Sequence, residues 1–184
     1  MPYALCYGVS VRINGVEPRG REIEQLERTL CLLPSMHLRA LPTITVGDRP
    51  ARGGGGSASP TMPGGPFIRL NRMIFDPVQR PVNAGRLNYT LLHEVGHIID
   101  WAFGCMATLA GSDPAGYAAL LAHAHSGATQ GPSEHFADAY ADFFFHGGSF
   151  NRGSDNGGWV MPRGNWARDP RIQAILGSPA FSDA

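Results

Sequence analysis

The residues best suited to chemistry in this chain are His93-Glu94-Val95-Gly96-His97, an HExxH sequence. Residues four apart lie on one face of a helix, so His93 and His97 can direct two imidazole nitrogens at one metal ion. Glu94 adjoins the first of them, where its carboxylate can take a proton from an attacking water. The spacing therefore predicts a hydrolytic zinc centre. The alternative is a helix whose two histidines only pack or cap.

A catalytic zinc needs a third protein ligand and an open position for water. The ligand pattern HExxHxxGxxH is excluded, because Asp100 and Phe103 stand where it needs Gly and His. Glu134 is the one glutamate after Glu94, and it opens a stretch that we expect to form a second helix, with Ser133 as its N-cap. We therefore predict Glu134 as the third ligand and keep Asp138, one turn later, as the weaker candidate.

Two aspartates are placed to support the ligand histidines. Asp138 and Asp100 could each accept a hydrogen bond from the far ring nitrogen of a ligand histidine and so fix its tautomer. Acidic side chains usually remain in solvent, and an exposed helix face is therefore the alternative role for Asp138.

The elements that must position these residues can be predicted from periodicity and breakers. An amphipathic helix is expected over 88–103, ended by Gly104, and further helices over 17–33, 113–124, 134–144 and 171–176. Strands are expected over 41–46 and 67–75, and loops over 47–65 and 147–164. Pro66 and the adjoining glycines suit a sheet edge. We therefore predict an edge strand that binds an extended peptide beside the metal, formed by Phe67, Ile68, Arg69 and Leu70.

This order of elements predicts an α+β, zincin-like fold, with a small twisted sheet packed on the HExxH helix and a mostly helical C-terminal part. Its 184 residues suggest one domain. Within it we expect a helix and sheet with an edge strand over 1–75, the active-site helices over 85–146, and a loop and short helix over 147–184.

HEVGHIID at 93–100, followed by EHFADAYADFF at 134–144, resembles the anthrax-lethal-factor-like metallopeptidases, which include bacterial Pro-Pro endopeptidases. The resemblance covers 87–145 well. It implies a gluzincin-type site with one Zn²⁺ per chain on His93, His97 and Glu134, and with Glu94 as the base.

The chain departs from that family at the oxyanion position. The family places a Tyr a few residues before the third-ligand Glu, but 126–131 contains none. His125 is the substitute that we predict, since an imidazole N–H can donate to an oxyanion. His123 and Tyr117 are the other nearby candidates, and a surface histidine at a helix end is the alternative role for His125.

The composition of the chain limits the classes of partner that we expect it to bind. The formal net charge is zero, and neither a basic stripe nor a membrane-length apolar run is present, so we expect no nucleic acid and no membrane partner. We expect a monomer acting on an extended polypeptide. No signal peptide is evident, which favours a cytoplasmic protein or export by a non-Sec route. The cysteines are three and widely spaced, so we expect buried thiols rather than a disulfide, at Cys6, Cys31 and Cys105.

These observations favour a zinc-dependent endopeptidase. All fifteen basic residues are Arg. A GC-rich genome would explain this, and avoidance of ubiquitin would fit a translocated toxin or effector. The alternative function is a zincin-fold domain that has lost turnover and serves as a protein-binding module.

Overall fold

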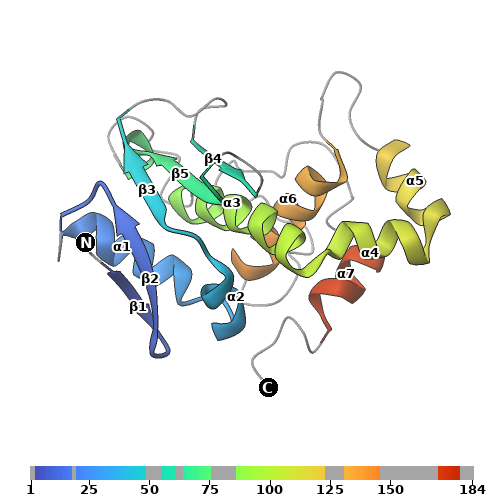
Figure 1. Ribbon diagram of the computed structural model, residues 1–184, viewed down its shortest axis with the longest axis horizontal. Coiled ribbons are helices and arrows are strands. Elements are labelled where there is room, and N and C mark those ends of the chain that lie inside the picture. The colour runs from blue at the N-terminus through green and yellow to red at the C-terminus, as the bar shows by residue number, and fades with distance from the viewer. Residues whose placement is uncertain are drawn as a thin grey trace.

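The chain has an α+β fold in which helices pack against a five-stranded mixed sheet (Figure 1). A computed structural model describes residues 3–17, 20–48, 55–60, 64–75, 86–122, 131–145 and 170–178. The strands are β1 (Tyr3–Cys6), β2 (Val9–Asn14), β3 (Ile44–Gly47), β4 (Gly56–Ser59) and β5 (Phe67–Asn71). The helices are α1 (Arg21–Leu30), α2 (Ser35–Ala40), α3 (Arg86–Phe103), α4 (Cys105–Ser112), α5 (Pro114–Ala122), α6 (Pro132–Phe145) and α7 (Pro170–Leu176), with a 3-10 turn η1 (Arg72–Phe75).

The sheet has the strand order β1-β2-β3-β5-β4. Strands β2, β3 and β5 run parallel, whereas β1 and β4 are antiparallel to their neighbours. The buried alternation of β2 and β3 follows their β-branched residues, with Val11, Ile13, Ile44 and Val46 facing the core. The strand predicted over 67–75 is shorter in the structure. It ends at Asn71, because the 3-10 turn begins at Arg72.

The prediction of an edge strand at Phe67–Leu70 is wrong. Strand β5 lies between β3 and β4, and Ser57 of β4 pairs with Arg69. The edge beside α3 is β4, which falls inside the stretch that was expected to be a loop. Its residues Gly56 to Ser59 have no strand propensity of their own, so pairing with β5 accounts for the strand.

Helices α1 and α3 contact one another and the sheet, and α6 packs along α3 (Figure 1). The apolar face predicted for α3 is confirmed at five positions that are fully buried, Leu91, Leu92, Val95, Ile98 and Ile99. It is wrong at the sixth, because Ala102 in the last turn is exposed. The left-handed Gly104 ends α3, as predicted, but the chain turns directly into α4, a helix that the sequence did not predict. The core face of α6 is formed by Phe136, Tyr140 and Phe144.

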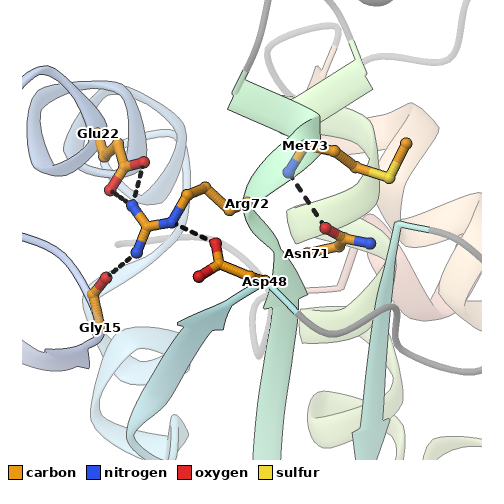
Figure 2. Close-up of polar contacts among 6 residues, drawn as sticks. All are labelled: Gly15, Glu22, Asp48, Asn71, Arg72 and Met73. Atoms are coloured by element: carbon orange, nitrogen blue, oxygen red, sulfur yellow. Dashed lines mark hydrogen bonds and ion pairs between the residues drawn. The ribbon is translucent and has the colours of Figure 1, made fainter.

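The carboxyl ends of the three parallel strands are tied together by one guanidinium (Figure 2). Arg72 donates to both carboxylate oxygens of Glu22 on α1, to Asp48 just after β3, and to the carbonyl of Gly15 just after β2. The hydrogen bonds to Glu22 and Asp48 are charge-assisted and therefore stronger than those between neutral groups. Arg72, which directly follows β5, therefore ties α1 to the carboxyl ends of β2 and β3.

The expectation of three thiols is wrong for two of them. Cys6 on β1 and Cys31 after α1 form a disulfide, with Cα atoms 5.1 Å apart. The bridge joins the first hairpin to the end of α1 across a separation of 25 residues. Only Cys105 is a buried thiol, and burial raises its pKa to about 12.

Among the described residues, no helix is long and apolar enough to cross a membrane.

Candidate metal centre

Helices α3 and α6 bring the HExxH residues and Glu134 together. The two helices pack closely at Gly96, where an added Cβ would lie 2.7 Å from the Cα of Ala137. Only a glycine at this position lets the two backbones approach so closely. This contact sets the distance between the two histidines on α3 and the carboxylate on α6.

The three predicted ligands form one group. The Nε2 atoms of His93 and His97 are 3.2 Å apart. The Oε2 atom of Glu134 lies 3.2 Å from Nε2 of His93 and 3.5 Å from Nε2 of His97. A tetrahedral ion with bonds of about 2.0–2.1 Å has ligand atoms about 3.3–3.4 Å apart. The observed triangle therefore fits a metal ion of that size and geometry.

The charges of these side chains reinforce this grouping. Hydrogen bonds from His93 and His97 hold the pKa of Glu134 well below its usual range. Burial alone would lower the pKa of His93, but hydrogen bonds to Asp138 and Glu134 outweigh it and raise that pKa to about 10. A site that draws positive charge to this point is suited to a cation.

Each ligand histidine has a partner on α6 for its other ring nitrogen. Asp138 Oδ1 lies 2.6 Å from Nδ1 of His93, and the Ser133 hydroxyl lies 3.2 Å from Nδ1 of His97. Both contacts leave Nε2 facing the metal position, as outer partners of metal-bound histidines do. Asp138 therefore takes the supporting position rather than that of the third ligand. Ser133 lies inside α6, which begins one residue earlier at Pro132, so its prediction as the N-cap is wrong.

Asp100 does not support a ligand histidine as predicted. Its Oδ1 accepts a hydrogen bond from the backbone N–H of Met106, 2.8 Å away, in the first turn of α4. The side chain is buried, and it satisfies a helix N-terminus where α3 turns into α4. Its role is structural, because the Nδ1 atoms of both histidines face Asp138 and Ser133 instead.

Glu94 lies against the edge strand. It is 7% exposed, and a Cβ at Gly56 would be 2.8 Å from its Oε1. Burial raises the pKa of the Glu94 carboxyl, whereas the adjacent histidines and a hydrogen bond from the backbone N–H of Ala58 lower it. The carboxylate is therefore held between the histidine pair and β4.

Of the three candidates for the oxyanion donor, only Tyr117 lies among the described residues. His123 and His125 lie outside the described residues. Tyr117 lies on α5, half-buried against the core. The prediction of His125 as the oxyanion donor therefore remains a prediction.

A separate hollow of about 480 Å³ lies beside the Arg72 cluster, lined by Arg21, Glu22, Gln25, Asp48, Asn71, Arg72, Met73 and Phe75. None of the ligand residues lines it. Its two acidic side chains already bind Arg72, as Figure 2 shows. We therefore place the candidate chemistry at the histidine pair and not here.

Sequence reasoning did not single out three contributors to the centre. They are Tyr89, Ser133 and the Gly56–Ala58 segment of β4. Tyr89 carried a usable signal, because it lies four residues before His93 and so on the same helix face. Ser133 only adjoins Glu134, and the segment of β4 resembles a loop.

Comparison with known proteins found no match: no family model, no curated protein and no solved structure is similar to this chain.

Proposed function

We propose that this protein is a zinc-dependent endopeptidase with a zincin-like fold. The observation that carries the proposal is the triangle of His93, His97 and Glu134 ligand atoms with the buried Glu94 carboxylate beside it. A site that served only structure would need no adjacent base and would normally have a fourth protein ligand. Among the described residues, the group contains three such ligands and no fourth.

The donor set favours zinc over other common ions. Two imidazole nitrogens and one carboxylate oxygen match catalytic zinc sites, whereas Ca²⁺ and Mg²⁺ prefer oxygen ligands throughout. When bound, zinc would polarise the scissile carbonyl and acidify a water in its open position.

The chain's own residues supply the proton transfers. Glu94 would accept a proton from the attacking water and pass it to the leaving amine. Burial raises its pKa toward the range in which a carboxylate can do both. The Ala58 N–H holds the carboxylate in place, and the supporting partners Asp138 and Ser133 keep both imidazoles oriented.

Strand β4 is the edge that we assign to substrate binding, in place of Phe67–Leu70. An extended peptide can add to a sheet edge through main-chain hydrogen bonds, which would hold the scissile carbonyl near the ion. Because Gly56 has no side chain, nothing at that position separates the strand from Glu94.

A protein-binding module that has lost turnover is the second candidate. The absence of a Tyr in 126–131, where the resembling family has its oxyanion donor, is the observation that favours it. The absence of Lys would also fit a toxin or effector that avoids ubiquitin, and we keep that role as part of the proposal.

A digest of a broad peptide library, read by mass spectrometry, tests the proposal. The zinc-loaded protein should cleave a subset of peptides, a chelator should abolish cleavage, and added zinc should restore it. The Glu24→Gln variant, which changes an exposed glutamate on α1, is the matched control for Glu94→Gln. It should cleave the library as the parent does. A fully zinc-loaded protein that cleaves nothing would favour the binding module.

A further inference from the structure

Tyr89 lies on α3 one turn before His93 and contacts the same supporting carboxylate. Its hydroxyl donates to Oδ1 of Asp138 at 3.0 Å. Its ring lies nearly parallel to the His93 imidazole, at 28° with centroids 6.4 Å apart. The Tyr89 side chain therefore spans from α3 to α6 directly beside the histidine that it would support.

One carboxylate oxygen receives both donors. Oδ1 of Asp138 lies 2.6 Å from Nδ1 of His93 and also accepts the Tyr89 hydroxyl. A single hydrogen bond to His93 would leave the carboxylate able to rotate about its terminal torsion, which has broad minima. A second donor from a neighbouring turn of the same helix restricts that rotation.

The Tyr89 side chain is held in place by its surroundings, so its hydroxyl has a defined position. Its ring is half-buried and packs against the hydrophobic core. The Asp138 side chain that it holds is only 18% exposed, so water competes little for the same oxygen. Packing of the ring thus fixes the position of the Tyr89 hydroxyl. The hydroxyl can in turn fix the orientation of the Asp138 carboxylate, which packing alone does not determine.

We propose that Tyr89 is a positioning residue for the metal centre: it fixes Asp138 Oδ1 against His93 Nδ1 and thereby aims His93 Nε2 at the ion. This inference rests on the metal site of the proposed function, but its test needs no turnover. The hydroxyl is engaged by Asp138, so Tyr89 is not the missing oxyanion donor.

A double-mutant cycle on zinc affinity tests the inference. We would measure zinc affinity by competition with a chromophoric chelator for the parent, Tyr89→Phe, Asp138→Ala and the double variant. Tyr89→Phe should weaken binding by about tenfold, the lower end for loss of an outer partner of a metal ligand. In the Asp138→Ala background the same change should cost almost nothing, because the proposed effect of the hydroxyl on zinc binding depends on that carboxylate. Tyr3→Phe, which removes a hydroxyl from an exposed side chain on β1, is the matched control and should bind zinc like the parent.

Two further readouts separate positioning from a general loss of structure. The visible spectrum of the Co²⁺-substituted protein should change in Tyr89→Phe and not in Tyr3→Phe. In the unaltered zinc-loaded protein, the Tyr89 hydroxyl proton and the His93 Nδ1 proton share one acceptor and should show a nuclear Overhauser effect. This last measurement holds even if the Phe variant fails to fold.

Parental zinc affinity in Tyr89→Phe, or an equal loss with and without Asp138, would overturn the inference. So would the absence of the Overhauser effect. A parent that binds no zinc would instead refute the proposed function, so the two failures are distinguishable.

Discussion

Replacing Gly96 by Ala tests whether the contact between α3 and α6 sets the geometry of the metal centre. The new Cβ would lie 2.7 Å from Ala137 Cα and 3.1 Å from its carbonyl oxygen. Ordinary carbon contacts begin at about 3.4 Å, so the helices must separate by about 0.7 Å at this point. Both neighbours are backbone atoms and cannot rotate away, and α6 must therefore shift as a whole.

The shift has two measurable costs. Overpacking costs about 1–3 kcal/mol, and Ala regains roughly 1 kcal/mol of helix propensity, so we expect a net loss of up to about 2 kcal/mol. For a chain of this size, that lowers the melting temperature by up to about 8 °C. Metal ligands tolerate about 0.2 Å, so moving Glu134 by more than that should weaken zinc binding by at least about tenfold.

The assay is thermal unfolding of the metal-free protein together with zinc affinity by chelator competition. Removing the metal separates intrinsic stability from stabilisation by a bound ligand. Gly111→Ala is the matched control, because that exposed glycine of α4 has nothing within 4 Å of an added Cβ. It should be neutral or slightly stabilising. Parental stability and parental zinc affinity in Gly96→Ala would refute the reasoning.

Three further predictions concern the same centre. Glu134→Ala should remove most of the one zinc per chain, measured by metal analysis after dialysis. Undiminished binding would mean that Glu134 is not a ligand. Because the pKa of His93 is raised to about 10, the metal-free site holds a proton at neutral pH that zinc must displace. Zinc affinity should therefore rise with pH up to about 10, and titration calorimetry at pH 7 in two buffers should show roughly one proton released per zinc; no release would contradict the assignment. Gly56→Ala should lower kcat by roughly tenfold or more with zinc content unchanged, since the new Cβ would meet Glu94 Oε1 at 2.8 Å. Equal kcat would mean that Glu94 need not occupy its present position.

The sequence predicted the parts of the site that lie on regular helices. The 3.6-residue period of α3 determines which residues face the core. The buried leucines and isoleucines therefore predict that His93 and His97 share the face of α3 that points away from them. Glu134 and Asp138 follow in the same way from the buried aromatic face of α6. Local periodicity is sufficient in both helices because packing and propensity agree.

The features that sequence reasoning missed depend on contacts between distant segments. Strand β4 consists of Gly, Ser and Ala, and its conformation comes from pairing with β5 rather than from its own residues. Without β4, the strand at Phe67–Leu70 resembles an edge. Cys6 and Cys31 meet only because α1 packs on β1, and an odd number of cysteines gives no indication of that pairing.

Cleavage and zinc content measured together on Glu94→Gln test the central claim most directly. The substitution keeps the size of the side chain and removes the proton acceptor, and Glu94 is not one of the three ligands. The variant should hold about one zinc per chain with nearly parental thermal stability. Peptide cleavage should fall by roughly 10²–10⁴-fold, the usual loss when general acid–base catalysis is removed. Cleavage at the parental rate by a zinc-loaded Glu94→Gln protein would contradict the assignment of this site as a zinc peptidase centre.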